Sequence, residues 1–396
     1  MPELMAVGRS TGRFGTVQLV AVELALFATG AAAYALPPVP GALAGAATGV
    51  LLLGTFGRAG GRWWYEVLGA RLRLTRRRRA GVRALRRTGT GDSLLVVLSP
   101  TPVTSTVNDR SGTIGIGQDA LGWFAAIAIR HPDGLTGESR TALRLDWLAT
   151  LAADPALPAS TVQLVLRHSS LPTAAVDPRS AASQSYLELC RLLAVPVHHD
   201  VWIAARVSAR DAATVAADRG GGLAGVHRAL VAAITRVGTG LASLGVEHAV
   251  LDGDGLRQAV AYSCGVEGTG APGPGAERWS RWQGGWRVQV CFAVRAWPAR
   301  PAVDPIRALT QVPSALDVSV AVVFGRRDGS TGPERRTGAR TLVRVACAPE
   351  TVEECVRQLL ASAAGAGVRL VRLNGEHGTG LYATAPTGAT LGLVTR

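Results

Sequence analysis

Paired carboxylates offer the first candidate chemistry in this chain. Asp252 and Asp254 flank Gly253 directly after the apolar run Val246–Leu251. Two carboxylates at a strand end can share one divalent ion and through it hold a sugar-nucleotide diphosphate, as in many glycosyltransferases. The same position suits a helix start, because an aspartate side chain accepts hydrogen bonds from the free amide groups of the first turn. We favour the helix cap, since no further catalytic carboxylate can be placed beside the pair.

Two glycine-rich segments are similar in pattern to phosphate-binding loops. Gly115–Ala120 nearly completes a dinucleotide fingerprint, but it lies between two strand-like runs and opens no helix, so a hairpin is the better interpretation. Arg219 precedes Gly220–Gly222 and a long helical segment, where glycine amides and a guanidinium can bind an anion. The simpler interpretation is a break between two helices, where glycine adopts dihedral angles that other residues avoid.

Metal, nucleophile and lysine chemistry find little support in the sequence. His198 and Asp200 share one strand face, but a metal site needs a third ligand that the sequence does not identify. The five cysteines are odd in number and widely spaced, so neither a disulfide framework nor a zinc site is expected. All 42 Lys and Arg residues are arginine, which excludes a Schiff-base lysine and a Walker A lysine. We therefore expect no catalytic residue, no cofactor and no metal.

A mixed set of strands and helices must position these residues. Helical periodicity is clearest over Gly222–Gly245, and further helices are predicted over Ser180–Ala194 and Thr351–Ala363. The predicted strands are Ser93–Leu98, Trp123–Ile129, Thr161–Leu166, Val201–Val207, Trp286–Val294, Asp317–Phe324 and Thr341–Ala346. A loop rich in Gly and Pro over Gly265–Gly275 predicts a subdivision near residue 270. The pattern predicts a mixed α/β domain over residues 91–396, with no evident internal repeat.

Two apolar runs near the N-terminus predict a transmembrane hairpin over residues 1–57. Thr16–Leu36 holds 21 residues with Glu23 as its one charge, and Val39–Phe56 holds 18 residues without a charge. A helix of 21 residues spans roughly 31 Å, the thickness of a bilayer core. Prolines between the runs predict a tight turn. Arginines on both outer flanks predict two spans in the cell membrane with both termini in the cytoplasm.

A stripe of glycines marks the second apolar run. Gly41, Gly45 and Gly49 recur at every fourth residue. Glycines at that spacing form a groove on one helix face, where another helix backbone can approach closely. We therefore predict that these three residues form a helix-packing face, with the first apolar run as the favoured partner and another protein as the second choice.

A basic segment over residues 58–90 follows the apolar runs. It carries 11 arginines against one acidic residue, and therefore +10 of the net charge of +14. Its centre is the run Arg76, Arg77, Arg78 and Arg79. Such a run can neutralise the phosphates of nucleic acid or bind anionic lipid and set membrane topology. Its position directly after an apolar run favours lipid and topology.

Several of these motifs together resemble EccE, the E component of actinobacterial type VII (ESX) secretion membrane complexes. They are the N-terminal hairpin, Trp63-Trp64-Tyr65-Glu66 with the arginine run, Gly112–Gly122, Asp200–Arg206, and Arg219–Gly222 with the helix that follows. The resemblance covers most of the chain. It implies a non-enzymatic subunit at the periphery of an assembly with EccB, EccD and the ATPase EccC. It also implies a cytoplasmic domain of degenerate glycosyltransferase type, and it maps no functional residue onto this sequence.

The predicted fold is thus a two-helix N-terminal transmembrane hairpin, a basic juxtamembrane segment and a mixed α/β cytoplasmic domain, degenerate glycosyltransferase-like. The predicted function is a structural subunit of a type VII secretion membrane complex that supports assembly and protein export. Its predicted partners are the other core subunits and anionic lipid, without nucleic acid. Two alternatives come from other classes: a membrane-anchored glycosyltransferase that uses Asp252 and Asp254, and a lipid-surface adaptor that acts through the arginine run.

Overall fold

The computed structural model describes residues 16–35, 37–59, 62–88, 103–109, 112–130, 145–169, 180–185, 188, 198–265, 276–284, 287–298, 304–326 and 337–390. Contacts within the chain define two compact units, a smaller one over residues 8–76 and a larger one that contains residues 77–396. The predicted strand Ser93–Leu98, the loop near residue 270 and most of the predicted helix Ser180–Ala194 lie outside the described residues. The subdivision near residue 270 therefore stays a prediction.

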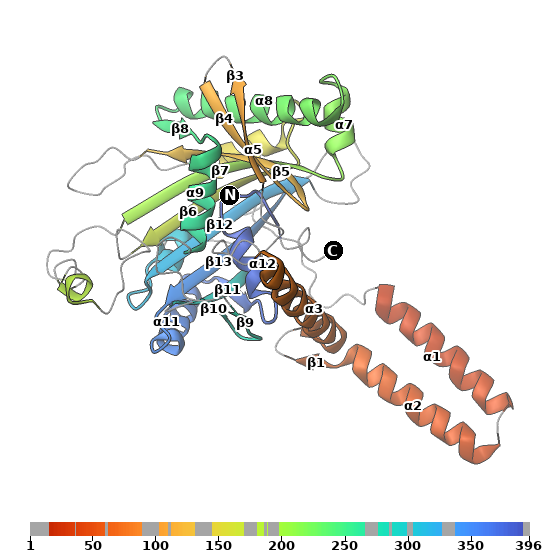
Figure 1. The fold of residues 1–396 in the computed structure, drawn as a ribbon. Helices are drawn as coiled ribbons and strands as arrows, with labels where there is room; N and C mark the ends of the chain where they lie inside the picture. Colours follow the sequence, from red (N-terminus) through yellow and green to blue (C-terminus); the bar gives the residue numbers. More distant parts are fainter. Residues whose placement is uncertain are drawn as a thin grey trace. The chain divides into compact units, whose positions relative to one another are not determined.

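The smaller unit contains two helices that pack side by side, α1 (Thr16–Ala35) and α2 (Pro38–Phe56) (Figure 1). A short antiparallel pair follows, formed by β1 (Arg58–Ala59) and β2 (Arg62–Trp63). Helix α3 (Trp64–Thr88) begins in this unit, and its residues from Arg77 onward belong to the larger unit. Helices therefore form where the apolar runs predict them.

The predicted transmembrane character of these helices is wrong. Among the residues that the structure describes, no helix has both the length and the apolar content needed to cross a bilayer. A span needs about 20 predominantly apolar residues. The 20 residues of α1 include Gln18 and Glu23, and the 19 residues of α2 include two prolines, four glycines and two threonines. The two-span topology inferred from the arginine flanks depended on this hairpin and is therefore not supported.

Gly45 and Gly49 of the glycine stripe face open space in the described part of the chain. A Cβ atom added at Gly45 or Gly49 would have no neighbouring atom within 4 Å. The described residues thus place no helix backbone against these two glycines. The packing role of Gly41, Gly45 and Gly49 stays a prediction, and the described part of α1 does not meet Gly45 or Gly49.

The larger unit is built on one 12-stranded sheet (Figure 1). The strand order is β3-β4-β5-β7-β6-β12-β13-β11-β10-β9, with β8 paired to β5 and β14 paired to β11. The strands are β3 (Val103–Asp109), β4 (Gly112–Asp119), β5 (Gly122–Ile129), β6 (Thr161–Ser169), β7 (His198–Ser208), β8 (His248–Val250), β9 (Ala276–Glu277), β10 (Trp282–Gly284), β11 (Arg287–Ala296), β12 (Asp317–Arg326), β13 (Thr337–Cys347) and β14 (Arg369–Arg372).

The pairing of these strands corrects a second part of the predicted fold class. All strand pairs in the described part of the chain are antiparallel. A glycosyltransferase-type α/β domain implies a mainly parallel sheet, in which helices connect neighbouring parallel strands. The degenerate glycosyltransferase-like fold is therefore wrong. Apolar runs alone predict strands and leave their direction open, which is why the sequence pattern allowed it.

Helices cover both faces of the sheet. They are α5 (Leu145–Ala153), α7 (Ala212–Ala217), α8 (Gly222–Ser243), α9 (Gly253–Cys264), α10 (Pro305–Thr310), α11 (Val352–Gly365) and α12 (His377–Ala383). On one face, Leu148 of α5, Ile234 of α8 and Leu359 of α11 join a large apolar core. On the other face, Leu256 of α9 and Leu381 of α12 join a second core. We call this second side the α9–α12 face.

The order of elements occurs twice within the larger unit. Apart from α7 and the helical residues 181–185, the described elements from β3 to α9 follow one another as strand, strand, strand, helix, strand, strand, helix, strand, helix. The elements from β9 to α12 follow the same order. The sheet consequently has the same order from either end, with β6 and β12 paired at its centre. The chain thus contains two structural halves, although the sequence pattern showed no repeat.

Each half contains a familiar arrangement of four strands. They lie in the order β8-β5-β7-β6 in the first half and β14-β11-β13-β12 in the second. This order is that of a split β-α-β-β-α-β unit. The first two strands of such a unit run in the same direction, and the third strand lies between them and pairs antiparallel with both. The larger unit is therefore two such units joined edge to edge.

Residues 384–390, which we call the C-terminal strap, follow α12 and cross to the first half. Gln163 of β6 is fully buried, and its Nε2 donates to the carbonyl oxygen of Ala383 at 2.7 Å. The amide of Gly388 donates to Oε1 of the same side chain at 2.6 Å. Thr161 of β6 also donates to the carbonyl oxygen of Gly388 at 2.8 Å. Since β6 belongs to the first half and α12 to the second, the strap connects the halves.

We expect Gln163→Met to weaken this connection. Methionine has a similar volume but neither donor nor acceptor of the amide, so the carbonyl of Ala383 and the amide of Gly388 lose their buried partner. The expected loss in the free energy of unfolding is about 2 to 4 kcal/mol, measured by urea denaturation. The matched control is Gln258→Met at an exposed position of α9, with a change below about 0.5 kcal/mol. Equal effects of the two substitutions would contradict the role of Gln163.

Candidate functional site

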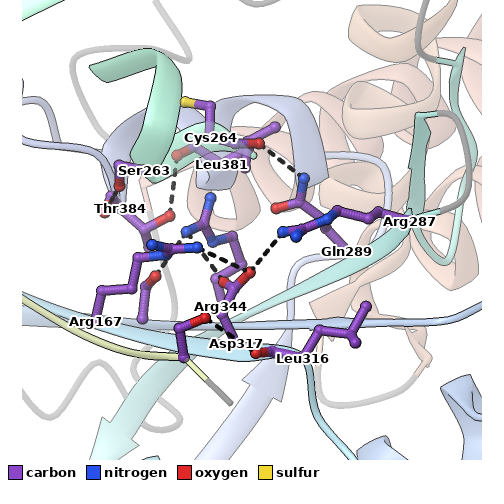
Figure 2. A network of polar contacts seen from close by, with 12 residues as sticks. Arg167, Ser263, Cys264, Arg287, Gln289, Leu316, Asp317, Arg344, Leu381 and Thr384 are labelled. Atoms are coloured by element: carbon purple, nitrogen blue, oxygen red, sulfur yellow. Dashed lines mark hydrogen bonds and ion pairs between the residues drawn. The ribbon is translucent and has the colours of Figure 1, made fainter. Parts of the chain in front are cut away.

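Charged side chains gather on the α9–α12 face of the sheet (Figure 2). Arg167 of β6, Arg287 of β11 and Arg344 of β13 point toward Asp317 of β12. The four side chains are at most 5 % exposed. We call them the arginine network. Ionised groups are almost never buried unless they are paired, so their mutual geometry decides what the site can do.

The register of three neighbouring strands creates the arginine network. Ser319 of β12 lies directly opposite Arg167 on one side and Arg344 on the other. Side chains in such cross-strand positions lie next to one another on one face of the sheet. Asp317 is two residues before Ser319 and therefore projects from the same face. The pairing of β6, β12 and β13 thus places two guanidinium groups beside one carboxylate.

Asp317 contacts all three arginines. Its Oδ2 accepts a hydrogen bond from Arg287 Nη1 at 3.0 Å and one from Arg167 Nη2 at 3.4 Å. Its Oδ1 lies 3.6 Å from Arg344 Nη2, which donates to Ser319 Oγ at 2.6 Å. Burial raises the pKa of Asp317, but the charges of the three arginines outweigh burial and lower it overall. The carboxylate therefore stays ionised at neutral pH.

Further contacts hold Arg167 in place. Its Nη1 donates to Asp200 Oδ2 at 3.2 Å, and its guanidinium lies 4.1 Å from the ring centroid of Tyr262 on α9. A cation above an aromatic face is attracted by the ring quadrupole. With Asp200 included, three guanidinium charges face two carboxylates. The described part of the network therefore carries one positive charge in excess.

Two helix ends compensate part of this excess. Helix α9 ends at Cys264 and α12 ends at Ala383 above the arginine network (Figure 2). The C-terminal end of a helix carries a partial negative charge, which favours nearby cations. Gln289 Nε2 donates to the carbonyl oxygen of Cys264 at 3.0 Å. This contact binds the end of α9 to the polar part of the sheet.

The chemistry of the arginine network is structural. A guanidinium does not deprotonate in a protein, so none of these arginines can act as a general base. Burial raises the pKa of the neighbouring Cys264 to about 11, which keeps its thiol protonated and unreactive at neutral pH. Among the described residues, no three His, Cys, Asp or Glu side chains come together to hold a metal ion.

A second buried ion pair joins the first half to α12 and the strap. Arg206 of β7 donates from Nη1 to Asp119 Oδ1 at 2.9 Å and from Nη2 to Oδ2 at 2.6 Å. Its Nε donates to the carbonyl oxygen of Thr387, and the Tyr382 hydroxyl donates to Asp119 Oδ2. Burial raises the pKa of Asp119, but Arg206 and Tyr382 together lower it overall. Both side chains of this pair are fully buried.

The paired aspartates of the sequence have structural or exposed positions. Asp252 is the N-cap of α9, where its side chain accepts a hydrogen bond from the amide of Gly255 at 2.8 Å. Asp254 is 89 % exposed at its side chain and pairs with Arg257. The predicted helix cap is confirmed. The two carboxylates therefore have different surroundings and roles.

Both glycine-rich segments also have their simpler interpretations confirmed. Gly115 lies in β4, which forms a hairpin with β5, and a Cβ atom there would lie 2.2 Å from the backbone oxygen of Asp252. This close approach of α9 to β4 requires glycine. Gly220, Gly221 and Gly222 all have positive φ angles and separate α7 from α8.

The histidine motif divides between the two faces of β7. Asp200 binds Arg167 on the α9–α12 face. His199 points to the opposite face, where its Nδ1 lies 3.2 Å from Nε2 of His168 on β6. The side chain of His198 lies outside the described ones, so its sharing of one face with Asp200 stays a prediction. Sequence reasoning missed that Asp200 serves the arginine network.

The arginine run has two kinds of position. Arg77 donates from Nε and Nη2 to the two carboxylate oxygens of Glu277, each at 3.2 Å. Glu277 is buried and also accepts from the amide of Gly378 in the first turn of α12. Arg76, Arg78 and Arg79 are exposed. One arginine of the run therefore binds a buried carboxylate within the larger unit, and the other three are exposed.

Comparison with known proteins gives a family for part of this arrangement. Residues 195–294 match a family model described as a putative type VII ESX secretion system translocon, EccE. This segment is EccE-like. The EccE-like segment contains Asp200, Arg206 and Arg287 from the two buried ion networks, and it spans helices α7, α8 and α9. No curated protein matches the chain.

We expect Asp317→Asn to destabilise the protein strongly. The substitution keeps the shape of the side chain but leaves three buried guanidinium groups without their shared carboxylate. Removing one partner of a buried ion pair costs about 3 to 5 kcal/mol. Urea denaturation measures the change in the free energy of unfolding. Asp254→Asn is the control at an exposed aspartate, and a similar small change for both variants would contradict a structural role for Asp317.

Proposed function

We propose that this EccE-like chain is a non-catalytic structural subunit of a type VII secretion complex, where it supports assembly and protein export at the membrane. The match of residues 195–294 to the EccE family model carries the proposal. Proteins of a translocon act through contacts with one another, so its proposed partners are the other core subunits, EccB, EccD and the ATPase EccC.

The surroundings of the charged residues support a non-catalytic role. Asp317 and Asp119 are bound by arginines, and Asp252 caps a helix. A glycosyltransferase of the rival class would need two carboxylates that share one metal ion. Asp254 instead pairs with Arg257 at the surface of α9. The described residues thus offer structural explanations for the carboxylates that an enzyme would use.

Two residue sets are proposed to make contacts within the assembly. The first is the small-residue face of Gly41, Gly45 and Gly49, which has room for a helix of another subunit against Gly45 and Gly49. The second is the exposed group Arg76, Arg78 and Arg79, which is proposed to bind the anionic headgroups of the membrane surface. Arg77 is left out of the second set because it is half-buried and not exposed.

We expect export to depend on assembly contacts and not on the paired aspartates. Cells that lack the chain should lose export of type VII substrates, and the double variant Asp252→Asn and Asp254→Asn should restore it, because asparagine also caps a helix. Loss of export by the double variant at normal protein level would favour the glycosyltransferase instead.

Gly45→Leu should reduce the size of the complex on native gels, since a large side chain fills the predicted packing face.

We expect Arg76→Gln, Arg78→Gln and Arg79→Gln together to weaken binding of the full chain to anionic vesicles. Polybasic attraction is worth on the order of 1 kcal/mol per residue near the surface and falls with added salt. Vesicle co-sedimentation at several salt concentrations measures the effect, and the control is Arg357→Gln on α11. Tighter binding of the wild-type chain to duplex DNA than to the vesicles at physiological salt would contradict the lipid proposal.

A further inference from the structure

A groove follows the outer surface of α8. It encloses about 980 Å³. Its floor is α8 from Ala224 to Gly240, and its walls include Asn108 of β3, Leu151 of α5 and Pro158. At 1.5 Å per residue, this part of α8 is about 24 Å long. The groove is therefore long enough for about four turns of another helix.

The groove combines an apolar middle with cationic ends. Val231, Ala232 and Leu151 line its middle, and Arg219 and Arg228 line the end near the start of α8. Arg236 lines it eight residues further along α8, about 12 Å from Arg228 along the helix axis. Neither the described residues that line the groove nor the sequence of α8 includes an acidic residue. Asp154 pairs with Arg236, while both side chains stay partly exposed.

The second half of the larger unit lacks these features at the corresponding helix. Helix α8 has 22 residues and carries Arg228 and Arg236 without an acid. Its counterpart α11 has 14 residues and carries Glu353, Glu354 and Arg357. Packing on the sheet requires only the buried side of each helix. The extra length and the charge of α8 therefore point to a role outside the core, and they lie within the EccE-like segment.

We propose that the groove along α8 binds an amphipathic helix of a partner subunit that carries acidic residues about two turns apart. The apolar side of that helix packs on Val231 and Leu151, and its carboxylates pair with Arg228 and Arg236. This proposal names a contact for the assembly role proposed above and rests on it. A surface that binds nucleic acid presents a continuous row of cations to the phosphates. The apolar middle of this groove favours a peptide helix over such a backbone.

Binding of a designed peptide tests the groove. The probe is an 18-residue helical peptide with leucine and alanine on one side and two glutamates eight residues apart. Fluorescence anisotropy measures its binding to the purified full chain. We expect binding in the micromolar range, at least tenfold weaker binding to Arg228→Glu, and weaker binding to Ala232→Glu, which adds a negative charge to the floor. Arg357→Glu on α11 is the matched control and should bind as the wild type does.

Two further peptides test the charge and the conformation of the partner. A peptide with lysine in place of both glutamates should bind Arg228→Glu better than it binds the wild type. A peptide with both glutamates and a central proline should bind at least tenfold more weakly, because proline interrupts a helix. Urea denaturation of each variant shows whether it is folded.

Several outcomes would overturn the proposal. The first is equal binding of the acidic peptide to the wild type and to folded Arg228→Glu. The second is binding of the lysine peptide to the wild type that equals its binding to Arg228→Glu. The third is binding of the proline peptide to the wild type that equals the binding of the acidic peptide. Displacement of the peptide by duplex DNA at physiological salt, with the same dependence on Arg228, would favour nucleic acid as the occupant. If the peptide fails while export still requires the chain, the groove proposal alone is wrong and the assembly role stands.

Discussion

The larger unit depends on one carboxylate that lies among three fixed cations. Asp317 on β12 joins Arg167 on β6, Arg344 on β13 and Arg287 on β11, so four strands from both structural halves meet at a single side chain. A charge taken out of water is tolerated only when opposite charge and hydrogen bonds replace the lost hydration. The antiparallel register that aligns Arg167, Ser319 and Arg344 is therefore coupled to the ion pairs, since a slip of one residue would turn these side chains to the other face.

The two faces of the sheet have different physical characters. The face under α5, α8, α10 and α11 is an apolar core, whereas the α9–α12 face holds the buried ion pairs together with Gln163. Apolar packing accepts many arrangements of similar volume, but charged partners accept few. We infer that the polar face fixes how the two halves pair, and that the apolar face supplies most of the burial. Helix α8 lies on the apolar face and takes no part in the buried ion pairs that the structure describes. Its length can therefore differ from that of α11 without changing how the halves pair.

Sequence patterns predicted the elements far better than their arrangement. The strands that contain Thr161–Leu166 and Asp317–Phe324 and the helix over Gly222–Gly245 appear in the structure, because periodicity reports which side of an element is buried. Strand direction and the repeated halves stayed hidden, since both depend on pairing between distant residues. The signal for the ion networks was present: Arg206 and Arg344 interrupt strongly apolar strands, where a charge requires a buried partner. Their partners could not be named, because Asp119 is 87 residues from Arg206 in the sequence.

The C-terminal strap has a consequence for the biosynthesis of the protein. Gln163 and Arg206 belong to strands of the first half, yet their backbone partners lie at residues 383, 387 and 388. Domains generally fold in the order in which the ribosome releases them, and a nascent first half has no access to these groups. Its polar face therefore stays hydrated and incomplete until residues 383–388 have left the exit tunnel. A product truncated before the strap would keep Gln163 and Arg206 without these backbone partners, and such an incompletely folded intermediate is the kind that chaperones retain and proteases remove.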